Sequence, residues 1–141
     1  MKKLTTFKGE PVTFVETTQI DDGIQCDVYS FVGDTTKDLG IITVRNGSAT
    51  PLQRVLVGTS TKEGYLAGKG SVTVETLAGI TTTYYFSEQN RKIEVSVTIG
   101  QTMQWKADRN SDLQFYEICE PPYTDDRFEN LAVPDGNSTS E

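Results

Sequence analysis

The 141-residue sequence contains no histidine. Imidazole is the commonest protein ligand for transition metals and the commonest general acid or base near neutral pH. Its absence excludes histidine metal sites and the usual serine and cysteine catalytic triads. Any proton transfer would fall to a carboxylate, a lysine or a tyrosine whose pKa has been shifted by its surroundings.

Cysteine is almost as scarce, since Cys26 and Cys119 are the only two. They lie far apart and show neither the paired spacing of a zinc site nor the density of a disulfide-stapled secreted domain. Polar and apolar residues alternate around each, which predicts reduced thiols on the apolar faces of strands. A disulfide would require neighbouring strands, and a catalytic thiol would lack a histidine base.

Long apolar runs and basic clusters are also missing. No segment approaches the length of a membrane span, and residues 1–6 are not followed by the apolar run of a secretory signal. The chain carries 13 basic against 20 acidic residues, a net charge of -7, whereas phosphate-backbone binding depends on clustered Lys and Arg. We therefore expect a cytoplasmic protein with no nucleic-acid or membrane partner.

Alternation of polar and apolar residues is the dominant pattern that is present. It is clearest in residues 70–77 and 92–99, and glycine-rich or small polar turns separate the segments. No segment shows the spacing of an amphipathic helix. Weaker alternation predicts further strands at residues 12–18, 24–31, 39–44, 52–57, 80–86, 103–107 and 113–119. We expect an all-β single domain over residues 1–131 and a flexible tail at 132–141, which has little to bury.

Three stretches carry a resemblance to a known family. Residues 47–54, leading into 64–74 with a Gly-x-Gly turn at Gly68 and Gly70, resemble the first motif of the cupin superfamily. Residues 97–107 resemble the second motif, and residues 119–123 resemble a common C-terminal segment of cupin-like chains. The resemblance implies a double-stranded β-helix, or jelly-roll, barrel whose interior is the only deep pocket.

The departures from the cupin pattern concern the metal. Gln53 and Val55 occupy the positions of the two motif histidines, and Thr61 or Glu63 occupies that of the glutamate. The third histidine would fall at Asn110 or Ser111. A transition metal needs about three or four converging N or O donors, which these residues do not supply. We therefore expect neither a metal nor another cofactor.

The resemblance also places candidate side chains in the barrel. If residue 53 faces inward, alternation directs Val55 inward as well and gives Thr61, Glu63 and Tyr65 a common face. The candidate ligand-binding residues are Gln53, Thr61, Glu63, Tyr65 and Trp105. The alternatives are that Glu63 lies in solvent, that Tyr65 only packs, and that Trp105, the single tryptophan, fills the core instead of forming a ligand platform.

Two further segments lead to predictions about surfaces. Tyr84, Tyr85 and Phe86 are consecutive, so they divide between both faces of a strand that we expect to be buried on both sides. One of those faces would then suit a homodimer interface. Near the C-terminus, we expect Arg127 to share a solvated charged surface with its acidic neighbours.

The leading functional hypothesis is a metal-free cupin-like domain that binds a small polar or carbohydrate-like molecule in its barrel. The first alternative is a metal-independent enzyme of the sugar epimerase, isomerase or lyase kind, which some cupin-like barrels are. In it, Glu63 or Tyr65 would act as acid or base. The second alternative is a non-catalytic structural dimer module. Fold similarity alone does not choose among them, because one barrel hosts many functions.

Overall fold

The computed structural model describes residues 3–91 and 93–131, so the predicted tail at 132–141 lies outside the described residues. All regular elements are β-strands in two antiparallel sheets. The first sheet contains, in spatial order, β1 (Thr6–Phe7), β2 (Glu10–Asp21), β3 (Ile24–Phe31), β4 (Asp34–Val44), β11 (Leu113–Glu120), β6 (Ser60–Gly68) and β9 (Glu94–Ser96). The second contains β12 (Phe128–Leu131), β5 (Leu52–Val55), β10 (Thr102–Ala107), β7 (Gly70–Glu75) and β8 (Thr81–Phe86).

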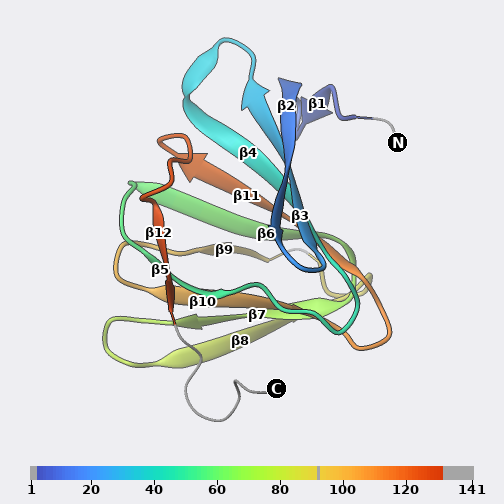
Figure 1. Ribbon diagram of the computed structural model, residues 1–141, viewed down its shortest axis with the longest axis vertical. Helices are drawn as coiled ribbons and strands as arrows, with labels where there is room; N and C mark the ends of the chain where they lie inside the picture. The colour runs from blue at the N-terminus through green and yellow to red at the C-terminus, as the bar shows by residue number, and fades with distance from the viewer. Residues whose placement is uncertain (1–2, 92, 132–141) are drawn as a thin grey trace.

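The two sheets face each other and enclose the main core (Figure 1). This arrangement confirms the all-β jelly-roll prediction. The predicted strand at 24–31 coincides with β3, and most others agree within a few residues. The sequence patterns missed β1, β6 and β12, which are short or, in β6, mix polar and small residues at buried positions. Among the described residues, no helix is long and apolar enough to cross a membrane.

Aromatic rings form the centre of the core between the sheets. Tyr65 stacks on Phe86 at 5.8 Å between ring centroids, Phe86 stacks on Trp105 at 5.5 Å, and Trp105 stacks on Phe115 at 4.0 Å. Such contacts contribute roughly 0.5–1.5 kcal/mol each beyond the burial of area. The stack therefore links strands of both sheets and fixes the distance between them.

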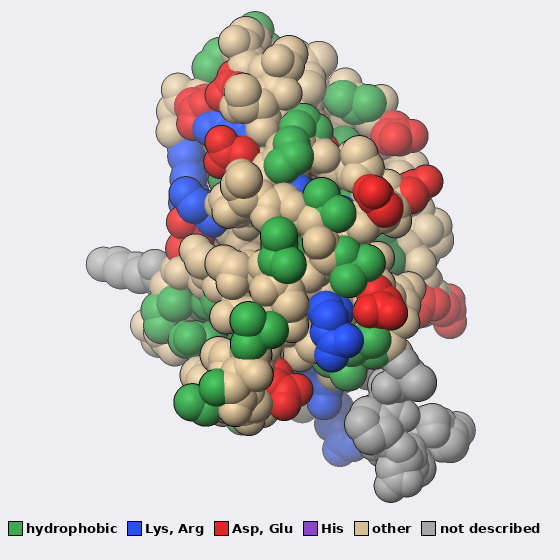
Figure 2. Space-filling view, turned by 90° about the vertical axis from the view of Figure 1, so that its left-hand side faces the viewer, with side chains coloured by type: hydrophobic (Ala, Val, Ile, Leu, Met, Phe, Trp, Pro, Cys, Tyr) green, Lys and Arg blue, Asp and Glu red, His purple; other side chains and the backbone are tan. Residues whose placement is uncertain are grey.

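Strand β8 lies at the edge of the second sheet and is only half covered within the chain. Phe86 is buried, whereas Tyr85 is 69% exposed, so the prediction that both faces are buried is wrong for the single chain. Figure 2 shows further exposed hydrophobic side chains on one face of the molecule, interspersed with polar surface. A homodimer formed through this strand stays a prediction.

The structure also overturns the prediction of a solvated Arg127, because this side chain is 1% exposed. Its guanidinium donates to the carbonyl oxygens of Pro121 at 2.8 Å and Ser60 at 2.6 Å, and to Thr61 Oγ1 at 2.6 Å. Gly58 leaves the space, since a Cβ at that position would lie 2.6 Å from the guanidinium nitrogens. Arg127 therefore anchors the segment between β11 and β12 to the start of β6.

Replacing Arg127 by alanine should destabilise the domain. The substitution leaves buried carbonyl oxygens without donors, at about 1–3 kcal/mol each, so we expect a total loss of about 3 kcal/mol. Urea unfolding followed by circular dichroism measures this loss. Arg109→Ala is the matched control because Arg109 is exposed. Equal stability of the two variants would contradict the anchoring role.

Candidate functional site

A pocket of about 630 Å³ lies between the two sheets, and strands of both sheets line it together with the segment before β12. Its floor includes one row of residues paired across five neighbouring strands. The register places them side by side in the order Glu16, Val28, Gly40, Glu117 and Glu63. Gly40 has no side chain, and a Cβ at this position would lie 3.1 Å from the sulfur of Cys26. The row thus brings Glu117 and Glu63 next to each other in the lining of the pocket.

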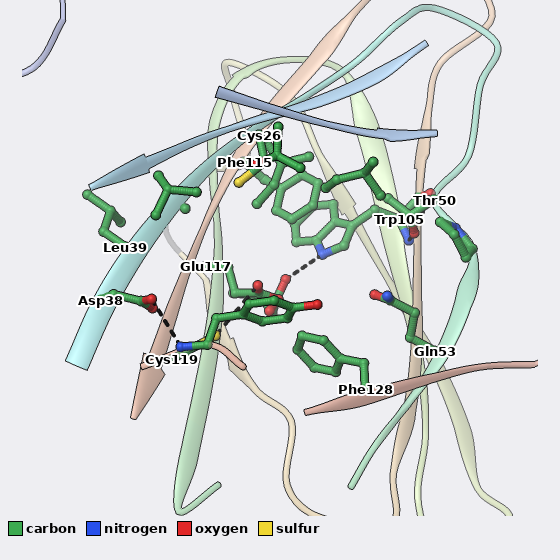
Figure 3. Close-up of a pocket in the computed structure, with 18 of the residues that line it drawn as sticks. Cys26, Asp38, Leu39, Thr50, Gln53, Trp105, Phe115, Glu117, Cys119 and Phe128 are labelled. Atoms are coloured by element: carbon green, nitrogen blue, oxygen red, sulfur yellow. Dashed lines mark hydrogen bonds between the residues drawn. The ribbon is translucent and has the colours of Figure 1, made fainter. Parts of the chain in front are cut away.

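Glu63 is fully buried at the floor of the pocket. Its Oε1 accepts a hydrogen bond from Trp105 Nε1 at 2.9 Å, the contact drawn as a dashed line from Trp105 in Figure 3. Its Oε2 has no donor among the described residues. The carboxyl group of Glu117, directly across on β11, can bond to Glu63 only through a proton held between them.

Burial raises the pKa of Glu63 well above its usual range, and the charge of Glu117 and a hydrogen bond with it raise it further. The hydrogen bond from Trp105 and the charge of Arg127 act in the opposite direction but are smaller effects on this pKa. Two adjacent carboxyl groups cannot both ionise cheaply in a buried site. The pair is therefore best described as two carboxyl groups that share one proton.

A third carboxyl group and two thiols surround this pair. Asp38 accepts a hydrogen bond from the Tyr123 backbone N–H at 3.0 Å, and burial raises the Asp38 pKa, with Glu117 adding to the effect. Cys26 and Cys119 are both free. Burial and then the charge of Glu117 raise the pKa of Cys26 to about 12 and raise that of Cys119 as well. Both thiols stay protonated and are poor nucleophiles.

The opposite side of the pocket is aromatic and amide-bearing. Phe128, at the start of β12, lines it, and its ring centroid lies 6.0 Å from that of Tyr123, whose backbone N–H bonds to Asp38. Gln53, on β5, also lines the pocket, and its Nε2 donates to Asn130 Oδ1 at 3.1 Å. In Figure 3, Gln53 and Phe128 lie across the cavity from Asp38 and Glu117. The pocket lining therefore combines carboxyl groups with aromatic rings and an amide.

Three of the five predicted site residues meet at this pocket, namely Gln53, Glu63 and Trp105. Trp105 is 1% exposed and stacked, so it packs in the core and presents its ring nitrogen to Glu63. Thr61 and Tyr65 are buried on the same strand but are absent from the pocket lining. Thr61 accepts a hydrogen bond from Arg127. Tyr65 donates from Oη to the Gly68 carbonyl oxygen at 2.7 Å.

The sequence patterns did not indicate Glu117, Asp38 or the two rings of Tyr123 and Phe128 as pocket residues. A signal for Glu117 was present, because it lies two residues before Cys119 on the same strand and so shares the face predicted for that thiol. Asp38 and Tyr123 had no such signal, since they meet only through a contact between positions 85 residues apart.

The positions at which a cupin metal would be bound do not fit a metal ion here. Val55 is a 1% exposed core residue, and the buried side chains of Thr61 and Glu63 bond to Arg127 and Trp105. Asn110, at the third histidine position, lies exposed in a turn outside the pocket. Residues 3–91 and 93–131 hold no group of three or more Cys, Asp or Glu side chains placed to bind a metal.

No protein-family model matches the sequence, and no curated protein matches it. Several solved structures are similar. CapF, a capsular polysaccharide assembling protein from Staphylococcus aureus, aligns with a TM-score of 0.62 at 15% identity, over 87% of this chain and 35% of that one. Oxalate decarboxylase from Bacillus subtilis aligns with a TM-score of 0.65 at 20% identity, over 79% and 29%.

A third similar structure is of comparable size to this chain. Rru_A2000 from Rhodospirillum rubrum, a cupin-2 domain, aligns with a TM-score of 0.63 at 14% identity, over 96% of this chain and 84% of that one. The chain thus spans about a third of CapF and of oxalate decarboxylase but most of the single cupin domain. These similarities show that the chain has the cupin fold.

Replacing Glu63 by glutamine should change how stability depends on pH. A carboxyl group whose pKa is raised on folding holds its proton more tightly in the folded state. The free energy of unfolding therefore falls as pH rises above the usual glutamate value of 4.5 towards the folded-state pKa. Glutamine keeps both contacts without a proton, because its amide oxygen can accept from Trp105 and its NH₂ can donate to Glu117.

Thermal unfolding of the wild type and Glu63→Gln across a pH series measures this effect. We expect the variant to have the higher Tm near neutral pH and the difference to shrink as pH falls towards 4.5. Glu75→Gln, on the exposed side of β7, controls for the loss of one negative charge. Parallel pH profiles for wild type and Glu63→Gln would contradict the shared proton.

Proposed function

We propose that this chain is a binding domain that holds a small polar or carbohydrate-like molecule between its two sheets. The observation that carries the proposal is the pocket of about 630 Å³, whose lining includes both carboxyl groups and aromatic rings. Its volume falls within the range typical of small-molecule sites, roughly 300–1,000 Å³. A merely packed barrel would not leave such a space.

The carboxyl groups and the aromatic rings of the pocket match the polar groups and the apolar faces of a carbohydrate-like molecule. Glu117 and Asp38 can accept hydrogen bonds from hydroxyl groups, and charge-assisted bonds of this kind are stronger than neutral ones. The rings of Tyr123 and Phe128 offer flat surfaces for the apolar faces of a sugar. The role of CapF in capsular polysaccharide assembly accords with a ligand of this class, although the proposal rests on the pocket itself.

Trp105 provides the assay, because it is the single tryptophan and lines the pocket. We expect ligands from a panel of monosaccharides, polyols and their amino and acidic derivatives to change its fluorescence and to raise the Tm. Val28→Phe should weaken binding about tenfold or more, because Val28 lines the pocket and a larger ring there would take up part of the space for the ligand.

Val32→Phe is the matched control, since Val32 is 56% exposed in the turn between β3 and β4. Isothermal calorimetry confirms each fluorescence change. Unaltered binding by Val28→Phe, or no binding by any panel member, would contradict a ligand site in this pocket.

A second candidate function is a metal-independent acid–base enzyme acting on the same class of molecule. The specific observation in its favour is the Glu63 and Glu117 pair, because two carboxyl groups sharing a proton supply an acid and a base in one site. The pairing of Glu63 with Tyr65 is less suitable, since Tyr65 Oη bonds to Gly68 and lies near Glu88 Oε2, at 3.0 Å, outside the pocket lining.

Solvent exchange tests this second candidate. An epimerase or isomerase of this kind should transfer deuterium from D₂O to a carbon of any sugar that binds, detected by proton NMR. Glu117→Gln should lower the exchange rate about a hundredfold or more, as expected when a general base is removed. Binding without exchange would exclude these two activities and leave the binding function intact.

A further inference from the structure

Every charged side chain that lines the pocket is acidic. Five strands or segments contribute them, and no lysine or arginine is among the residues that line the cavity. The charged lining residues are Glu16, Asp38, Glu63, Glu117 and Asp125. An excess of one charge sign in a partly enclosed cavity focuses the field and attracts ligands of the opposite charge.

The cation whose charge acts on Glu63 and Asp38 is Arg127, and it is already engaged elsewhere. Arg127 directs its guanidinium at three neutral oxygens and is not part of the pocket lining. It lies within 4.0 Å of no carboxylate oxygen in the part of the chain that the structure describes. Its positive charge lowers the pKa values of Glu63 and Asp38, but by less than burial raises them. The carboxyl groups therefore lack a contacting countercharge.

Independently of this acidic cluster, Glu63 Oε2 points to a missing donor. The side chain is fully buried, and this oxygen has no donor among the described residues, whereas its partner oxygen is bonded to Trp105. Buried acceptors of this kind are normally satisfied by protein, water or ligand. Glu63 is also among the residues that line the pocket.

We infer that the ligand of this pocket carries a primary ammonium group on a small hydroxylated frame, as in an amino sugar with a free amine. The inference rests on the proposed binding function and specifies its ligand class. An ammonium group has three donors and no acceptor. Glu63 and Glu117 face each other directly, and Asp38 lies diagonally from Glu117 on β4, so three adjacent strands each contribute a carboxyl group to the lining of the pocket.

The aromatic rings of the pocket suit the same ligand. Phe128 lies across the cavity from Asp38 and Glu117 (Figure 3), and the ring of Tyr123 lines the same cavity, so the frame of an amino sugar would lie against rings while its amine meets carboxylates. Ring faces also attract cations that approach within about 6 Å. An anionic sugar, by contrast, would meet several like charges in the same space.

Matched pairs of molecules test the inference. The probes are glucosamine against glucose and N-acetylglucosamine, and ethanolamine against ethylene glycol, with glucuronate as the anionic member. Binding to the full chain is followed by Trp105 fluorescence and calorimetry at constant ionic strength. We expect each ammonium compound to bind about tenfold or more tightly than its neutral partner, because each gains a charge-assisted bond.

Variants then assign the effect to the pocket. Glu117→Gln and Asp38→Asn should each weaken binding of the ammonium compound more than binding of its neutral partner, so that the preference for the ammonium compound falls. Glu75→Gln removes the same charge at an exposed position outside the pocket and should preserve the preference. Circular dichroism and the Tm show whether each variant is folded. Because there are two variants, the test can still be made if one of them does not fold.

The outcomes separate this inference from the function on which it rests. Equal or tighter binding of the neutral or anionic members overturns the ammonium inference but leaves the binding function in place. Displacement of the ammonium compound by millimolar Ca²⁺ or Mn²⁺ at constant ionic strength would mean that the carboxyl groups serve a metal ion, and it also overturns the inference. If no probe of any class binds, both fail together.

Discussion

The burial of Glu63 beside Glu117 is the constraint on which the organisation of this domain depends. A carboxyl group removed from water must hold a proton, find a donor for each oxygen or meet a countercharge. Trp105 supplies one donor, and this hydrogen bond fixes the indole within the aromatic stack between the sheets. The second oxygen is left to the shared proton or to a ligand. Glu63 therefore takes part both in the packing of the core and in the chemistry of the pocket.

Arg127 connects the stability of the fold to the shape of the same pocket. Its three hydrogen bonds hold the segment between β11 and β12 against the start of β6. Tyr123 and Phe128, on either side of it in sequence, supply aromatic rings to the pocket lining. The segment is too short and too polar at its surface to hold this position by burial alone. These rings are therefore positioned by a buried cation that is not itself part of the pocket lining.

Period-two alternation predicted the all-β class and most strands, because burial of one strand face imposes that pattern directly. It failed in β6, where Thr61 and Glu63 occupy inward positions that alternation assigns to apolar residues. It failed again at Arg127, whose exposed neighbours Asp125, Asp126 and Glu129 suggested solvent, whereas its actual partners are backbone oxygens distant in sequence. The alternation of residues along a strand shows which face of the strand is buried. It does not show which partners the polar side chains on that face will bond to.

The same distinction explains how a cupin fold persists at 14–20% identity to other cupin structures while its site changes. The fold requires inward apolar side chains, such as Val55 and Phe115, and turns of the correct length; it does not require particular metal donors. In this chain the positions that resemble the metal-binding ones hold Gln53, Val55 and either Thr61 or Glu63, and these side chains are packed in the core or bonded to other groups of the chain. The charged groups of the cavity then include carboxyl groups on three adjacent strands. The charge of the pocket, and not the fold around it, therefore determines which ligands it can select.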